Sequence, residues 1–199
     1  PHPLFFRCGG SPQAAEISAK PSPVHLFWGD KPEVIAGKVR DMKALAARYG
    51  RKDALRFGMR LQIICRDTEG EAWEEAWRLI RGASRFDFVN MRTGASAVEG
   101  IRRTSDANRR VWELLEQSGD DMKIHPHLWT GISTVRIGAG IAVVGNPAQV
   151  AATLQEFVDA GCSTFCLSGY PHADAARIFS SKVMPYFKGR IADRLPEVA

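Results

Sequence analysis

The sequence predicts an α/β protein built around a parallel β-sheet, and three observations lead to that fold class. Short apolar runs alternate along the chain with longer segments whose apolar residues recur at helical spacing. Glycine, proline or a capping residue stands at most of the boundaries between them. Hydrophobic residues make up 45% of the 199 residues and charged residues 25%, as is usual for a globular protein. Strands that alternate with helices are typically parallel to one another.

These patterns predict four strands and six helices. The strands are expected at residues 4–6, 24–28, 55–65 and 164–167. The helices are expected at about residues 12–20, 30–49, 68–80, 105–117, 146–161 and 173–183. Four strands make either a small open sheet or half of a (β/α)8 barrel, because a complete barrel usually needs about 250 residues. The number of strands alone leaves both architectures open.

Capping residues indicate where several of the helices begin. Asp30 is expected to cap the second helix, which has a proline in its first turn. Thr68 and Glu71 have the spacing of a capping box, in which each side chain bonds to the other residue's backbone N–H. Asn146 precedes a proline and is expected to cap the fifth helix.

The third strand carries two different faces. Met59 and Leu61 fall on one side of it, and Arg60 and Gln62 fall on the other. An apolar face is expected to pack beneath helices, whereas arginine and glutamine are costly to bury without partners. Arg60 and Gln62 therefore face either the ligand side of a barrel or the solvent at the edge of a sheet.

Residues 83–145 interrupt the alternation of strands and helices. They contain one predicted helix and glycine-rich stretches, and they are too long for a plain loop. We interpret them as an insertion before the last strand. Arg136 lies beside the flexible Gly138 and Gly140, which suits either a mobile loop that closes over an anion or an ordinary surface loop.

Composition excludes several classes of function. The formal net charge is +5 and no long Lys/Arg run occurs, so a nucleic-acid interface is not expected. The four cysteines lack the spacing of a zinc or redox motif, and His125 and His127 lack a third ligand, so no metal site is expected. No apolar run reaches 18 residues and no signal peptide precedes the first strand, so we expect a cytoplasmic protein without a membrane span.

Three turns at the carboxyl ends of predicted strands could bind a ligand, because ligands of parallel α/β folds sit there. Gly9-Gly10-Ser11 precedes a helix, whose free N–H groups suit a phosphate, although a tight turn alone would also explain the glycines. Trp28 ends the second strand and could line a pocket. Tyr170 and His172 follow the last strand and can exchange protons.

Taken together, several motifs resemble the luciferase-like flavin monooxygenases, most of all their alkanesulfonate monooxygenase branch. The resemblance rests on their order and spacing over residues 4–185, nearly the whole chain. The motifs are Gly-Gly-Ser at residues 9–11, Leu-Phe-Trp-Gly-Asp-Lys-Pro-Glu at 26–33, Arg-Phe-Gly-Met-Arg-Leu at 56–61, Leu-Trp-Thr-Gly at 128–131, Val-Arg-Ile-Gly-Ala-Gly at 135–140, Val-Val-Gly at 143–145 and Leu-Ser-Gly-Tyr-Pro-His at 167–172.

The resemblance implies the carboxyl-terminal half of a TIM (β/α)8 barrel, with strands equivalent to the fifth to eighth, over residues 1–199. Residues 83–145 would be the family insertion, with its mobile loop. The implied activity is a two-component monooxygenase that converts alkanesulfonates to aldehyde and sulfite with O2. Reduced FMN would come from a separate NAD(P)H-dependent FMN reductase, and the enzyme is expected to be a homo-oligomer.

The resemblance also implies roles for individual residues. Arg60, Arg136 and Tyr170 match catalytic positions, and the turn Gly9, Gly10 and Ser11 matches the one that receives the FMN phosphate. Gln62, Trp28 and His172 are candidates for the substrate pocket. Gln62 stands where the alkanesulfonate enzymes have histidine, and an amide cannot take up a proton near neutral pH.

Two alternatives accompany this interpretation. The substrate could be a sulfone or another small organosulfur compound. The chain, which resembles only half of a barrel, could also be a fragment of a longer enzyme or a truncated relic that binds flavin without turning over a substrate.

Overall fold

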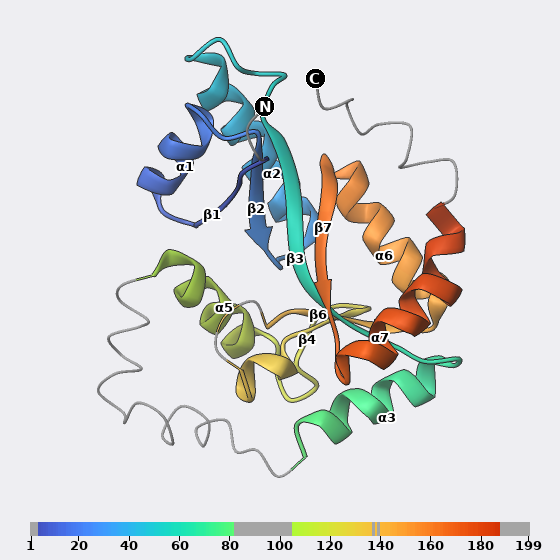
Figure 1. Cartoon of the computed structure of the whole chain (residues 1–199). Helices are drawn as coiled ribbons and strands as arrows, with labels where there is room; N and C mark the ends of the chain where they lie inside the picture. The colour runs from blue at the N-terminus through green and yellow to red at the C-terminus, as the bar shows by residue number, and fades with distance from the viewer. Residues whose placement is uncertain (1–3, 82–104, 137, 139, 188–199) are drawn as a thin grey trace.

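Four parallel strands form the centre of the computed structural model (Figure 1). They are β1 (Phe6–Cys8), β2 (Val24–Trp28), β3 (Arg56–Cys65) and β7 (Cys162–Ser168). The structure describes residues 4–81, 105–136, 138 and 140–187. All four predicted strands are present, but β1 begins two residues later than expected, because only residues 6–8 lie in register with β2. Within the described residues β1 pairs only with β2 and β7 only with β3, so the sheet stays open.

Three short strands that the sequence analysis did not predict extend the sheet. They are β4 (Lys123–His125), β5 (Leu128–Trp129) and β6 (Ala142–Gly145). β6 runs parallel to the second half of β3, and β5 and β4 follow it in antiparallel order. The backbone N–H of Arg56 donates to Pro23 and that of Gln62 to Ile141, both at 2.9 Å. Residues an even number apart in a strand point their N–H groups to the same edge. β2 and β6 therefore pair with the same edge of β3, β2 along its first half and β6 along its second half.

Six α-helices surround the sheet within the described ranges. They are α1 (Pro12–Ala19), α2 (Pro32–Ala47), α3 (Glu69–Leu79), α5 (Asp106–Gln117), α6 (Pro147–Asp159) and α7 (His172–Ile178). The last is followed by a π-helical turn at Phe179–Val183 and a 3-10 turn at Met184–Phe187. The final predicted helix therefore ends as a regular α-helix at residue 178, five residues earlier than expected.

The predicted caps of two helices are confirmed and a third is wrong. Thr68 and Asn146 each form a complete capping box. The residue at the N-cap of α2 is Lys31, not Asp30, and Lys31 makes no side-chain capping bond. The reason is that the carboxylate of Asp30 is held in a buried ion-pair cluster with Lys38 and Arg110.

One face of the sheet is covered by helices and contains the main core. Met59 and Leu61 are fully buried there, as predicted, and pack with α2 and α6. A second apolar cluster joins Ile64 of β3 to α3 and to Trp129 of β5. The insertion is therefore not a separate body: its described residues supply β4–β6 to the central sheet, while its residues 83–104 lie outside the described residues.

The opposite face of the sheet, which we call the open face, carries exposed and partly exposed side chains near the carboxyl ends of β2, β3 and β7. Strand register places Trp28, Arg60 and Cys166 in one row across β2, β3 and β7, and Gln62 beside Ser168 in the next. Trp28 and Arg60 are partly exposed and Cys166 is exposed. Arg60 thus lies on the side away from α2 and α6, as the alternation of the strand predicts.

Candidate functional site

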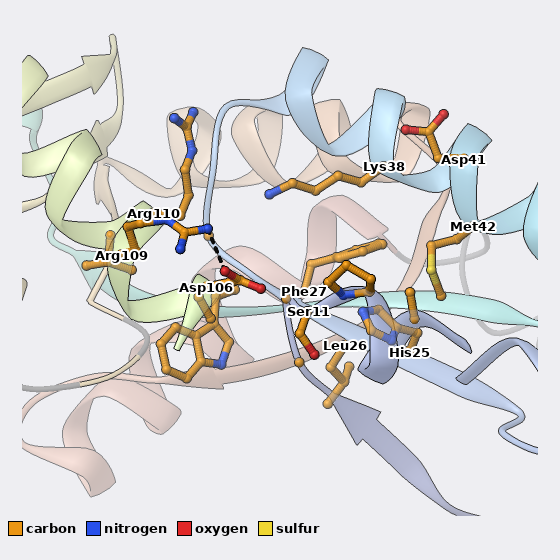
Figure 2. Close-up of a pocket in the computed structure, with 18 of the residues that line it drawn as sticks. Ser11, His25, Leu26, Phe27, Lys38, Asp41, Met42, Asp106, Arg109 and Arg110 are labelled. Carbon is orange, nitrogen blue, oxygen red and sulfur yellow. Dashed lines mark hydrogen bonds and ion pairs between the residues drawn. The ribbon is translucent and has the colours of Figure 1, made fainter. Parts of the chain in front are cut away.

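A pocket of about 580 Å³ opens at the carboxyl end of β2. Its walls come from the turn before α1, the end of β2, and helices α2 and α5 (Figure 2). Lys38, Asp41 and Met42 lie on the α2 side, and Arg109 and Arg110 face them from α5. The volume falls within the range of small-molecule and cofactor sites.

The turn that was predicted to receive a phosphate lines this pocket. Gly9, Gly10 and Ser11 all contribute to its wall. Ser11 caps α1 by accepting a hydrogen bond from the backbone N–H of Ala14 at 3.2 Å. Gly9 has φ +148°, and a Cβ on it would lie 2.5 Å from the Cβ of Ala14. This glycine is therefore required by the tight turn itself.

Gly10 allows a second helix to approach the turn. A Cβ on Gly10 would lie 3.2 Å from the backbone nitrogen of Ala107, in the first turn of α5. The pocket thus has the amino ends of α1 and α5 at the same place, and the partial positive charge there favours an anion. Its ionic side chains are balanced, since three are basic and three acidic, so they add no surplus of positive charge.

Asp30, which the sequence analysis assigned to a helix cap, holds α2 and α5 together beside the pocket. Its buried carboxylate accepts from Arg110 Nε at 2.8 Å and Nη2 at 3.0 Å, and from Lys38 Nζ at 3.1 Å. Burial by itself would raise the pKa of Asp30, but the hydrogen bonds and charges of Arg110 and Lys38 lower it below its usual value. No local pattern could reveal this cluster, because Arg110 lies 80 residues away from Asp30.

The structure brings four other predicted residues together on the open face of the sheet. Trp28 and Arg60 are neighbours in register. With its amide oxygen toward Arg136, Gln62 accepts from Arg136 Nη1 at 2.5 Å, and its nitrogen faces Ser168 Oγ at 3.0 Å. A Cβ on Gly138 would lie 4.0 Å from Cη2 of Trp28, so the segment after Arg136 lies beside the indole. The partner Ser168 was missed by sequence reasoning, because only strand pairing places it beside Gln62.

Tyr170 and His172 follow β7 and contact each other. Their rings lie edge to face with centroids 4.9 Å apart. Tyr170 is partly buried and His172 is exposed. Neither lines the pocket beside α5, and among the described residues neither forms a hydrogen bond or ion pair with Arg60 or Arg136. The structure thus places the predicted residues in three groups: the pocket turn, the arginine cluster, and the Tyr170–His172 pair.

Two further groups near the pocket have shifted pKa values. Burial lowers the pKa of His25 to about 4, so this histidine is neutral at physiological pH. Its Nδ1 lies 2.8 Å from Ser18 Oγ. Burial raises the pKa of the Cys8 thiol, against the opposing effect of the Arg60 charge. Neither group is therefore charged near neutral pH.

The described residues contain neither a membrane-spanning helix nor a cluster of metal-binding side chains. No helix in the described part of the chain is long and apolar enough to cross a membrane. No group of three or more His, Cys, Asp or Glu side chains in the same ranges is placed to hold a metal ion.

Solved structures, two of them of monooxygenases, share this fold. The long-chain alkane monooxygenase LadA matches with a TM-score of 0.67 at 21% identity, over 94% of this chain and 41% of its own. DmoA from Hyphomicrobium sulfonivorans matches with a TM-score of 0.69 at 21% identity, over 94% and 42%. The EDTA monooxygenase EmoA from Chelativorans sp. BNC1 gives 0.65 at 16% identity, over 94% and 44%.

These matches decide between the two architectures that the strand count left open. The chain spans less than half the length of each of these three structures, so its open sheet is a half-barrel, as the resemblance implied. At such low identities the matches establish the fold alone. The family model for luciferase-like monooxygenases matches residues 1–164, most of the sequence. On this match and this half-barrel fold, the chain belongs to the luciferase-like monooxygenase family.

Proposed function

We propose that this chain provides the carboxyl-terminal half of the active site of a two-component monooxygenase that uses reduced FMN and O2. The proposed substrates are alkanesulfonates or related small organosulfur compounds such as sulfones. The observation that carries the proposal is the cluster of Arg60, Arg136 and Gln62 at the carboxyl ends of the strands, beside Trp28. In this fold the carboxyl ends of the strands carry the chemistry.

The pocket beside α5 fits a cofactor phosphate in shape. The turn of Gly9, Gly10 and Ser11 would hold it, and Trp28, which lines the same pocket, would border the ring system. Because the ionic side chains of the pocket balance, the donors to the phosphate would be backbone N–H groups of the turn and of Gln13, since Pro12 has no N–H and the N–H of Ala14 donates to Ser11. FMN is therefore compatible with this turn.

The two arginines suit an anionic substrate. Within the described residues, neither Arg60 nor Arg136 forms an ion pair, so no carboxylate of the described ranges neutralises their charge. A sulfonate is a permanent anion near neutral pH, and the guanidinium group offers paired planar donors to its oxygens. Tyr170 and His172 are proposed to border the same site after β7, where Tyr170 could move a proton.

Reduced flavin would supply the electrons that activate O2. The balanced overall reaction is RCH2SO3⁻ + FMNH2 + O2 → RCHO + SO3²⁻ + FMN + H2O + H⁺. The work of this chain in that reaction is to hold the anion with Arg60 and Arg136, to hold the phosphate at the turn before α1, and to exclude water.

A partner polypeptide is part of the proposal. Leu4, Phe5 and Phe6 at the free edge of β1 are 47–60% exposed. An exposed apolar strand edge pairs readily with another chain. We propose that further polypeptide completes the barrel, that the enzyme forms homo-oligomers, and that an NAD(P)H-dependent reductase supplies the flavin in the cytoplasm.

The test combines flavin binding with product release. Reduced FMN is titrated anaerobically, and sulfite is then measured with a reductase present for a series of alkanesulfonates and sulfones. Arg136→Ala is expected to lower sulfite release tenfold or more while flavin binding changes little, because a charge-assisted contact contributes about 1.5–3 kcal/mol. Arg177→Ala is the control, since this arginine is exposed on α7 and pairs only with Asp174 among the described residues.

Each alternative has its own result. Flavin binding without sulfite from any sulfonate, but with turnover of a sulfone, would move the substrate to that class. Flavin binding without any turnover would favour the relic. Unchanged sulfite release by Arg136→Ala would remove this arginine from the site.

A further inference from the structure

Gln62 is a buried polar residue at the centre of the open face of the sheet. Gln62 is only 1% exposed, although it lies on the same face of the sheet as the partly exposed Arg60. It sits at the point where β3 pairs with β7 on one edge and with β6 on the other. A buried amide must find hydrogen-bond partners, and those partners fix its orientation.

Among the described residues, Gln62 has partners on two separate segments. Its oxygen accepts from Arg136 Nη1 at 2.5 Å. Its nitrogen donates to Ser168 at the end of β7, with Oγ at 3.0 Å and the carbonyl oxygen at 3.3 Å. The Ser168 hydroxyl can bond to either end of the amide, so it is the Ser168 carbonyl oxygen, which can only accept, that sets which way the amide points, and the amide oxygen in turn sets where the guanidinium of Arg136 lies.

The contact between Gln62 and Arg136 differs from the way Arg110 and Arg78 are held. Arg110 is bound by the carboxylate of Asp30, and Arg78 by that of Glu75. Those contacts neutralise the cation. An amide oxygen holds a guanidinium without cancelling its charge, and it does not titrate near neutral pH. Arg136 is therefore fixed in place and still available to an anion.

We infer that Gln62 is a positioning residue, which holds the Arg136 guanidinium at the carboxyl end of the sheet through an uncharged contact so that its full charge remains for an anionic substrate. The inference rests on the proposed function for the identity of the anion, and on the contacts of Gln62 for the rest. In this role Gln62 orients the guanidinium of Arg136 and exchanges no proton.

Two substitutions separate orientation from charge. Gln62→Leu keeps the volume but removes both contacts. Gln62→Glu keeps an acceptor for Arg136 but adds a negative charge, as Asp30 does for Arg110. Thr153→Val on α6 is the matched control, because this threonine is equally buried and bonds only to the helix carbonyl of Gln149 among the described residues.

The readouts are the NMR signals of arginine side-chain nitrogens and the affinity for 1-propanesulfonate between pH 6 and 9. In the parent chain we expect a restrained Arg136 signal and an affinity that does not vary with pH. Gln62→Leu should release the signal and weaken binding severalfold. Gln62→Glu should keep the signal restrained yet weaken binding about tenfold or more, because the anion then competes with a carboxylate.

Each outcome decides something. A restrained Arg136 signal in Gln62→Leu, or undiminished propanesulfonate binding by Gln62→Glu, would overturn the inference. If either variant does not fold, Gln62→Met also keeps the volume while removing the amide and should broaden the Arg136 signal; a signal unchanged there would also overturn the inference. If the variants show the expected NMR changes but the parent chain binds no propanesulfonate, the positioning role stands and the proposed substrate is contradicted. Binding of reduced FMN within twofold in every variant is the control for the flavin site.

Discussion

The ion-pair cluster of Asp30 makes an asymmetric prediction about stability. We expect Arg110→Met to destabilise the fold more than Asp30→Asn, although the two substitutions break the same contact. The reason is burial: the Asp30 side chain is 0% exposed, whereas those of Arg110 and Lys38 are 32% and 41% exposed. A cation left behind can turn to water, but the carboxylate cannot.

The contacts set the magnitudes. Arg110→Met removes both charge-assisted bonds at 2.8 and 3.0 Å and leaves the buried carboxylate with Lys38 and one backbone N–H. Breaking a buried pair costs about 3–5 kcal/mol when the charge is left alone. Because Lys38 remains, we expect about 2–3 kcal/mol. Asp30→Asn leaves only partly solvated cations and should cost about 1–2 kcal/mol.

Urea unfolding followed by circular dichroism measures both values at pH 7 and at pH 4. The pKa of Asp30 is lower in the folded state than in the unfolded state, so its contribution is present above the unfolded value and is lost as the pH falls. The deficit of Arg110→Met should therefore shrink at pH 4, where a variant that lacks Arg110 can protonate Asp30.

Arg109→Met on the same helix is the control. Arg109 pairs with Asp106 at the surface, and exposed pairs contribute about 1 kcal/mol at most. Two results would refute the reasoning: a cost for Arg109→Met equal to that for Arg110→Met, or a larger cost for Asp30→Asn than for Arg110→Met at pH 7.

Two further predictions concern the pocket wall. Burial lowers the pKa of His25 from its usual 6.5 to about 4, so the free energy of unfolding should fall between pH 6.5 and 4 by up to about 3 kcal/mol. His25→Gln, which keeps a possible partner for Ser18, should flatten that slope in unfolding titrations. A slope unchanged in the variant would show that another group causes it. Gly9→Ala should lower the free energy of unfolding by about 2 kcal/mol or more, because Gly9 has a positive φ and the added Cβ would lie 2.5 Å from the Cβ of Ala14. Gly70→Ala, in α3 with open space around it, should be neutral or stabilising by up to about 1 kcal/mol, and equal effects at the two positions would contradict the packing argument.

Local sequence patterns predicted the strands and helix starts that depend on local forces. The capping boxes at Thr68 and Asn146 were readable because their partners lie three residues away. The two faces of β3 were readable because side chains alternate along a strand, and Met59 and Arg60 lie as expected. The resemblance then supplied the half-barrel and the candidate residues, which alternation alone left undecided.

The tertiary structure decided what depends on residues distant in the sequence. Strands of two to four residues, such as β5 and β6, have too little pattern to be recognised and exist because β3 offers them a free edge. Asp30 looked like a helix cap, since aspartate suits one, yet the long-range bonds from Arg110 outweigh a single capping bond. Gln62 looked only like a departure from its relatives until β7 and the segment after η1 (Gly131–Thr134) brought Ser168 and Arg136 to it. Helix caps and hydrophobic periodicity depend on residues that are close in the sequence. The partners of buried charges and amides come from distant segments that the packing of the core places beside them.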